Sequence, residues 1–140
     1  MKKRVLILCT GNSARSQMGE GLLRHEAEEL FAVESAGTKP GIVRPEAIAV
    51  MQEIGIDISG HRSKCVDEFG GQHFDFVITV CDSARQTCPV FFGAARQLHQ
   101  SFDDPAAMAG SEQERLKIFR RVRDELRLYL AEFCAGAELV

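Results

Sequence analysis

The residues best suited to chemistry lie between Val5 and Glu20, in the sequence VLILCTGNSARSQMGE. A short apolar run predicts a strand that ends at Cys9, and Arg15 and Ser16 open a predicted helix. Loop amides and a helix N-terminus direct N–H groups and partial positive charge to one point, and an arginine can hold two oxygens of an anion. The loop is therefore expected to bind an oxyanion beside Cys9.

Cys9 is the expected nucleophile of this loop. An arginine and a helix N-terminus favour thiolate over thiol, so a lowered pKa is predicted for Cys9. A buried cysteine at a strand end is also a common packing residue. The C-x5-R-S spacing favours the site, because Gly11 and Asn12 tolerate the left-handed backbone that turns amides inward. The expected oxyanion-binding loop consists of Thr10, Gly11, Asn12, Ser13, Ala14 and Arg15.

Asp103 and Asp104 are the candidate acids of the site. A nucleophile that displaces an oxygen needs a proton donor for the departing oxygen, and a carboxylic acid can supply that proton. Adjacent carboxyls repel each other when both are charged, and desolvation raises one pKa further, so one of the two is expected to stay protonated near neutral pH. The alternative is that Asp-Asp-Pro is an ordinary turn.

Cys81 and Cys88 form a second candidate pair, in the sequence CDSARQTC. In a helix their Cα atoms would lie about 10 Å apart, beyond the roughly 7 Å limit for an unstrained disulfide. A disulfide between them would require the helix to open, which is the behaviour of a redox switch. The alternative is two packing cysteines. Packing is also the expected role of Cys65 and Cys134.

Alternating strands and helices must position these residues. Such alternation predicts an α/β fold, a doubly wound and mostly parallel four-stranded sheet flanked by helices on both faces. Ligands of such folds lie beyond the carboxyl ends of the strands, where Cys9, Cys81 and the aspartates are expected. The predicted strands are 5–9, 32–36, 74–80 and 98–102, and the predicted helices are 15–30, 45–54, 64–69 and 111–133.

Composition narrows the possible functions. With 140 residues and 45% hydrophobic content, residues 1–140 are expected to form a single domain. A net charge of −3 argues against general nucleic-acid binding. The apolar runs are too short for a signal peptide or a membrane span, and five widely spread cysteines are unlike a secreted disulfide framework, so a cytoplasmic protein without membrane association is expected. No cysteine or histidine has metal-ligand spacing, and no metal is expected.

The chain resembles the thioredoxin-coupled arsenate reductases, which are built on the low-molecular-weight protein tyrosine phosphatase fold. The Cys81/Cys88 pair distinguishes them from phosphatases of this fold, which do not require it. The motifs that carry the resemblance are CTGNSARSQM from Cys9, SAG from Ser35, IDIS from Ile56, the Cys81/Cys88 pair, FDDP from Phe102 and RVRDE from Arg121.

The resemblance implies a role for each residue of the first step. Cys9 would attack the arsenic of arsenate, and Arg15 would hold the oxygens. Ser16 would stabilise the thiolate, and Asp104 would protonate the departing hydroxyl. Phosphate and sulfate would compete as oxyanions of the same shape.

The later steps implied by the resemblance involve thiols alone. Cys81 would attack Cys9, which expels arsenite and leaves a disulfide. Cys88 would then attack Cys81, and thioredoxin would reduce the resulting disulfide at the surface. Glutaredoxin or another thiol is the alternative reductant, and no tightly bound cofactor is implied.

Some members of this family bind potassium beside the loop through an asparagine, a glutamate, a serine and an aspartate. Asn12, Glu20 and Ser35 match three of these ligands, but Lys64 stands at the aspartate's position. An ammonium group there would repel or replace a monovalent cation, so the ion site is not expected to survive.

Two further functions remain open on the sequence. The same loop could form a phosphocysteine at Cys9 that water hydrolyses, with Cys81 and Cys88 as a safeguard against oxidation. Weak phosphatase activity is expected even of a reductase. The other alternative is a non-catalytic oxyanion or redox sensor.

Overall fold

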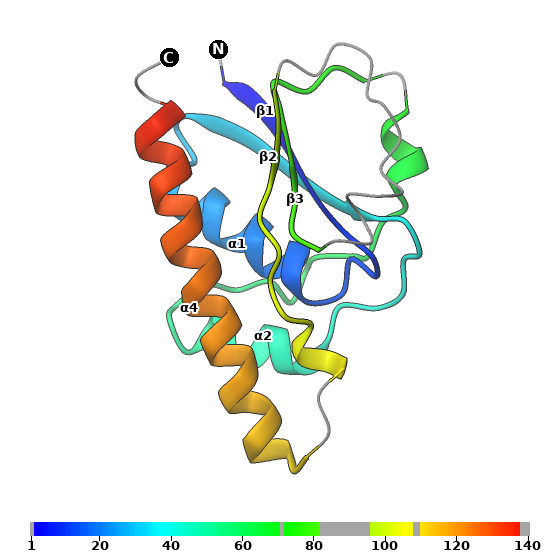
Figure 1. Ribbon diagram of the computed structural model, residues 1–140, viewed down its shortest axis with the longest axis vertical. Coiled ribbons are helices and arrows are strands. Elements are labelled where there is room, and N and C mark those ends of the chain that lie inside the picture. The colour runs from blue at the N-terminus through cyan, green and yellow to red at the C-terminus, as the bar shows by residue number, and fades with distance from the viewer. Residues whose placement is uncertain (1, 71, 82–95, 108–109, 138–140) are drawn as a thin grey trace.

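A four-stranded parallel sheet with the order β2-β1-β3-β4 forms the centre of the computed structural model (Figure 1). The structure describes residues 2–70, 72–81, 96–107 and 110–137. All three strand pairings are parallel, so the carboxyl ends of the strands meet at one edge. The strands are β1 (Lys3–Cys9), β2 (Phe31–Gly37), β3 (Phe76–Thr79) and β4 (Arg96–His99).

β1 is an inner strand because its sequence is apolar on both faces. Val5, Leu6, Ile7 and Leu8 are each fully buried, as expected for a strand of a parallel sheet that is covered on both sides. The last residue of β1, Cys9, pairs with Gly37 of β2. The nucleophile candidate therefore lies at the carboxyl end of a buried inner strand.

Within the described residues, three α-helices and two short 3₁₀ turns accompany the sheet. α1 and α4 lie side by side, and α2 packs against the earlier part of α4 (Figure 1). None of the described helices is both long and apolar enough to cross a membrane. The elements are α1 (Arg15–Ala27), α2 (Pro45–Gln52), η1 (Val66–Phe69), η2 (Pro105–Ala107) and α4 (Glu112–Ala137).

α4 begins at a capping residue and buries one apolar stripe. The Ser111 hydroxyl accepts a hydrogen bond from the Glu114 N–H at 3.2 Å, as the capping-box sequence predicts. The guanidinium of Arg123, nearly buried, donates to the carbonyl of Val50 at 2.8 Å and joins α4 to α2. The buried stripe contains Phe119, Val122, Leu126 and Leu130.

The expected four-stranded parallel α/β fold is confirmed, with differences at element ends. The first helix ends at Ala27 rather than near residue 30, because the Leu30 carbonyl accepts a hydrogen bond from the Lys3 N–H and the chain turns into β2. The last strand is Arg96–His99 rather than 98–102. The helix expected at 64–69 is a single 3₁₀ turn.

Replacing Gly21 by alanine is expected to destabilise the fold. Gly21 lies on the buried side of α1, and a Cβ atom there would lie 2.6 Å from Cγ2 of Ile58. Because the β-branched Ile58 cannot rotate away freely, we expect the free energy of unfolding to fall by about 1–3 kcal/mol in urea denaturation.

Gly136→Ala in α4 is the matched control. Nothing lies within 4 Å of a Cβ atom at that position. Its unfolding free energy is expected to stay the same or rise by up to about 1 kcal/mol, because alanine is the better helix former. A Gly21→Ala protein as stable as the natural one would contradict the close packing of α1 on Ile58.

Candidate oxyanion-binding site

The loop between β1 and α1 is folded around the sulfur of Cys9. Asn12 has a φ of 47° and is the one non-glycine residue in the left-handed region within the described part of the chain. This conformation turns the Asn12 N–H toward Cys9, with an N···Sγ distance of 3.2 Å. Gly37 lets β2 pass directly behind the loop, since a Cβ atom there would lie 2.5 Å from the Thr10 carbonyl oxygen.

Ser16, at the start of α1, contacts the Cys9 sulfur directly. Its Oγ lies 2.8 Å from Sγ of Cys9. The Asn12 side-chain amide donates to the same Oγ at 2.7 Å. Because Ser16 already accepts this bond, its own hydroxyl proton is available to the sulfur, where it stabilises a thiolate.

A buried polar network holds Asn12 in place. The Asn12 amide also donates to Oγ of Ser35 at 3.0 Å, and Ser35 donates to Oε1 of Glu20 at 2.6 Å. Oδ1 of Asn12 accepts bonds from the Gln17 side chain at 2.9 Å and from the Lys64 N–H at 2.8 Å. Every polar group of the Asn12 side chain therefore has a partner inside the protein.

Gln17 is a further member of this network, and the sequence motifs did not indicate it as a site residue. Its side chain is fully buried and donates to both the carbonyl and the side chain of Asn12. Oε1 of Gln17 lies 3.0 Å from Nδ1 of His61. The signal in the sequence is a polar residue within the apolar face of a predicted helix, where a buried amide needs several hydrogen bonds.

Burial raises the pKa of the Cys9 thiol above its usual range, which corrects the expectation of a lowered pKa. The sulfur is removed from water, and this penalty on the charged form outweighs the hydrogen bonds from Ser16 and the Asn12 N–H and the charge of Arg15, which all lower the pKa. The expectation from the sequence included the charge and the helix N-terminus but not the burial. The thiolate fraction of Cys9 consequently increases with pH through the alkaline range.

Arg15 connects the loop to the segment that follows β4. One of its nitrogens donates to the Phe102 carbonyl at 3.1 Å, and another lies 3.7 Å from Oδ2 of Asp104. The Asp104 side chain is 42% exposed and that of Arg15 is 12% exposed. Asp104 therefore lies at the solvent-facing side of the arginine, where an acid can reach a bound anion.

The two adjacent aspartates have different partners. Asp104 accepts a hydrogen bond from the Ala106 N–H at 3.0 Å, which fixes its carboxyl near Arg15. Asp103 instead pairs with Arg121 of α4 at 2.9 Å. The structure thus places Asp104 beside Arg15 and Asp103 against a helix.

Cys81 lies beside the loop, two residues beyond the end of β3. It is buried, and its sulfur is 3.2 Å from Oγ1 of Thr10, the residue that follows Cys9. β1 and β3 are neighbours in the sheet, so both cysteines emerge at the same carboxyl edge. Cys88 lies outside the described residues. Cys65 precedes η1 and Cys134 lies near the end of α4, both half-buried.

Asn12, Glu20 and Ser35, which match three potassium ligands of the family, lie together, but a monovalent cation does not fit among them, as the presence of Lys64 led us to expect. Nζ of Lys64 is 3.4 Å from Oε1 of Glu20. Both Asn12 Oδ1 and Glu20 Oε1 already accept hydrogen bonds, the latter from Ser35. Across residues 2–70, 72–81, 96–107 and 110–137, no group of three or more His, Cys, Asp and Glu side chains is arranged to hold a metal.

Ser16→Ala is expected to raise the pKa of Cys9 further. The Ser16 hydrogen bond lowers this pKa, so its loss moves the alkylation–pH profile of Cys9 to higher pH. Near neutral pH we expect iodoacetamide to alkylate Cys9 at least about tenfold more slowly, since a hydrogen bond to a charged group contributes about 1.5–3 kcal/mol. Mass spectrometry of the Cys9 peptide measures the rate.

Ser101→Ala, at an exposed position, is the control for this change and should leave the profile where it is. A profile for Ser16→Ala that overlays that of the natural protein would show that the 2.8 Å contact does not stabilise the thiolate.

Comparison with known proteins identifies the family. Residues 4–139 match the family described as low molecular weight phosphotyrosine protein phosphatase. An arsenate reductase of Shouchella clausii is 39% identical over 137 residues, covering 98% of this chain and 99% of that protein. One of Bacillus subtilis is 40% identical over 131 residues, covering 94% of each. A solved arsenate reductase in the phosphate binding state has a TM-score of 0.83 at 32% identity, covering 96% of this chain and 98% of the other. The chain belongs to the low molecular weight phosphotyrosine protein phosphatase family and, within it, to the arsenate reductases.

Proposed function

We propose that the protein reduces arsenate to arsenite through a relay of Cys9, Cys81 and Cys88. The observation that carries the proposal is the placement of Cys81 beside the loop, where its sulfur lies 3.2 Å from the hydroxyl of Thr10. Hydrolysis of a phosphocysteine needs a water molecule and no second thiol. Reduction needs a second thiol close to the first, and two neighbouring strand ends provide one.

The first step joins sulfur to arsenic. Loop amides and Arg15 bind the arsenate oxygens, and the Cys9 thiolate attacks the arsenic. Asp104 gives a proton to the departing hydroxyl, which leaves as water. One arsenic–oxygen bond breaks and one sulfur–arsenic bond forms, while arsenic stays in its +5 state.

The second step transfers the electrons. The Cys81 thiolate attacks the Cys9 sulfur, the sulfur–arsenic bond breaks, and its electron pair stays on arsenic, which leaves as arsenite in the +3 state. A disulfide between Cys9 and Cys81 remains, so two thiols have supplied the two electrons. The hydroxyl of Thr10 contacts the Cys81 sulfur, and Thr10 directly follows Cys9 in the loop.

The third step restores Cys9. Cys88 attacks Cys81 and transfers the disulfide to the Cys81–Cys88 pair, and a dithiol protein of the thioredoxin class reduces that pair by thiol–disulfide exchange. Glutaredoxin is the other candidate donor. A reducing compartment such as the cytoplasm maintains both donors.

Phosphomonoester hydrolysis is the second candidate function. It is favoured by the family itself and by the solved arsenate reductase in the phosphate binding state, because phosphate and arsenate are tetrahedral oxyanions of the same charge. The loop, Arg15 and Asp104 would have the same roles with phosphorus at the centre. A sensor that binds an oxyanion without turnover is the third candidate function. Multiple turnovers of arsenate would exclude it.

Replacing each cysteine of the relay tests the proposal. With arsenate, thioredoxin, thioredoxin reductase and NADPH, we expect Cys9→Ser, Cys81→Ser and Cys88→Ser each to reduce steady-state NADPH consumption to background. Cys88→Ser should still release about one arsenite per enzyme molecule, because the first two steps need only Cys9 and Cys81. Cys134→Ser serves as the control and should retain the full rate.

Hydrolysis of p-nitrophenyl phosphate separates the reductase from the phosphatase. Cys81→Ser and Cys88→Ser should keep this activity, and Cys9→Ser should lose it. Unchanged arsenate turnover in Cys88→Ser would contradict the relay. If the natural protein hydrolyses p-nitrophenyl phosphate rapidly and no NADPH is consumed with arsenate in the coupled assay, its function is that of a phosphatase.

Exchanging the two aspartates for asparagine tests the acid. Asp104→Asn should slow arsenite formation in a single turnover by about 10²–10⁴-fold, the usual contribution of a general acid. Asp103→Asn loses only an exposed ion pair with Arg121, in which the side chains are 59% and 44% exposed, and should stay within about twofold of the natural rate. Equal losses of rate in the two variants would show that the contact of Asp104 with Arg15 does not identify the general acid.

A further inference from the structure

Lys64 is a buried lysine that the proposed chemistry does not use. It is 8% exposed, and its ammonium nitrogen lies 3.4 Å from Oε1 of Glu20 and 3.3 Å from Oε2 of Glu34. Its backbone N–H donates to Oδ1 of Asn12 at 2.8 Å. One residue therefore contacts the polar network behind Cys9 at two points, once through its charge and once through its main chain.

Glu20 requires positive charge because it is 2% exposed. A carboxylate removed from water is tolerated only when it is paired and hydrogen-bonded. Arg24 supplies one ion pair, with its Nε 3.2 Å from Oε2 of Glu20, and this side chain is 49% exposed. Lys64 supplies the buried pair on the other oxygen, Oε1.

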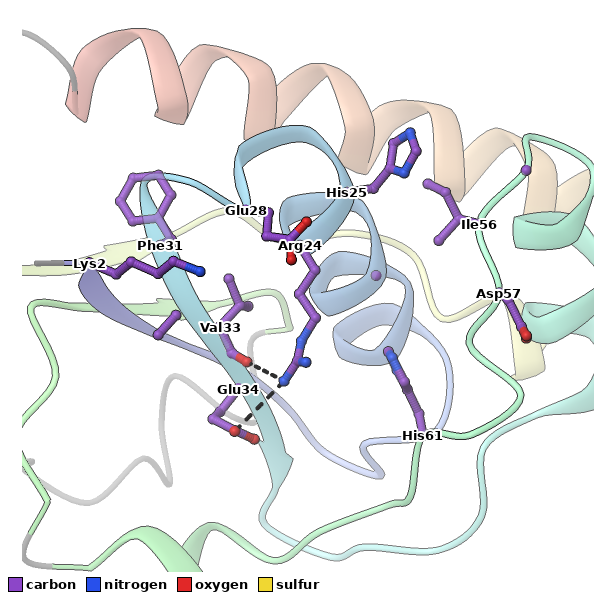
Figure 2. A pocket seen from close by; sticks show the side chains of 13 residues that line it. Lys2, Arg24, His25, Glu28, Phe31, Val33, Glu34, Ile56, Asp57 and His61 are labelled. Carbon is purple, nitrogen blue, oxygen red and sulfur yellow. Dashed lines mark hydrogen bonds and ion pairs between the residues drawn. The ribbon is translucent and has the colours of Figure 1, made fainter.

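Figure 2 shows a pocket that is lined by Arg24 and Glu34 but not by Glu20 or Lys64. The volume of this pocket is about 460 Å³. Arg24 extends across the pocket to the Val33 carbonyl and to Glu34, and His61 points into the same space (Figure 2). The ammonium of Lys64 reaches Glu34 as well as Glu20, so two carboxylates share the two fixed cations, Arg24 and Lys64. The charges of the four groups balance without any dissolved ion.

A continuous series of contacts leads from Glu20 to the nucleophile. Oε1 of Glu20 accepts the Ser35 hydroxyl at 2.6 Å, and Ser35 accepts the Asn12 amide at 3.0 Å. The same amide donates to Ser16 at 2.7 Å, and Ser16 lies 2.8 Å from the Cys9 sulfur. The carboxylate to which Lys64 binds thus fixes the direction of the amide that orients Ser16.

We propose that Lys64 is a positioning residue for the reaction of Cys9, and that its ammonium group makes the loop independent of potassium and other monovalent cations. The ammonium neutralises Glu20 permanently, and the N–H of Lys64 holds Asn12 in its left-handed turn. Where the inference concerns turnover it rests on the proposed arsenate reduction. Where it concerns the reactivity and stability of the loop it stands independently.

The natural protein provides the first test, which needs no variant. Thermal unfolding and the rate of Cys9 alkylation are measured in potassium, sodium and tetramethylammonium chloride at equal ionic strength. We expect unfolding temperatures equal within about 1 °C and alkylation rates equal within about twofold. A specific rise in either quantity with potassium would overturn the proposal, because it would reveal a cation site that Lys64 does not replace.

Lys64→Met is the second test, because methionine retains most of the side-chain length and removes the charge. We expect Cys9 alkylation near neutral pH to slow at least about tenfold and the unfolding temperature to fall by at least about 5 °C, since one partner of a buried ion pair is lost. Potassium or methylammonium at high concentration should restore part of both. The matched control is Lys117→Met, which removes an exposed lysine of α4 and should match the natural protein.

A double variant addresses the outcome in which Lys64→Met folds poorly. Glu20→Gln combined with Lys64→Met removes both charges, so it is expected to unfold at a higher temperature than Lys64→Met alone. A double variant no more stable than the single one would show that Lys64 does not act through Glu20. Alkylation of Cys9 at the natural rate in Lys64→Met would also overturn the proposal.

The alkylation readout separates this inference from the proposed function. If the natural protein does not turn over arsenate and Lys64→Met still slows alkylation, the arsenate proposal fails and the role of Lys64 stands. If the natural protein reduces arsenate and Lys64→Met reduces it equally fast, the proposed function stands and the role of Lys64 is wrong.

Discussion

The left-handed turn at Asn12 is the constraint on which the rest of the site depends. It directs the main-chain N–H of Asn12 at the Cys9 sulfur and its side chain into the interior, where four neighbouring residues bind it. A buried polar network of this kind is rigid when every group is satisfied and costly when one is not. The absence of a side chain at Gly37, where β2 passes behind the loop, is a consequence of the same turn.

The strand, loop and helix that carry the site could be predicted from local sequence. The apolar run before Cys9 is the signal of a buried strand, and Ser111 with Glu114 is the signal of the start of α4. The edge at which Cys9 and Cys81 meet also followed from the alternation of strands and helices, because parallel strands end at one edge. These predictions needed only spacing and residue type.

Properties that depend on packing could not be predicted in the same way. The direction of the Cys9 pKa depends on how completely the fold excludes water from the sulfur. The separation of Asp103 from Asp104 depends on Arg121, a residue of a distant helix, and on Arg15. The sequence shows that a lysine, Lys64, stands where some relatives of this family have an aspartate, but its contact with Glu34 is visible only in three dimensions.

The place of β1 between β2 and β3 also determines when the site can form during protein synthesis. Cys9 is translated before Gly37, Lys64 and Thr79, whose segments support the loop or pair with its strand. At about 5–20 residues per second, β3 follows β1 by several seconds, and until then β1 lacks one of its two neighbours. In a growing chain the environment that surrounds Cys9 in the fold is therefore still missing. The loop can bind an oxyanion only after the ribosome has completed most of the sheet.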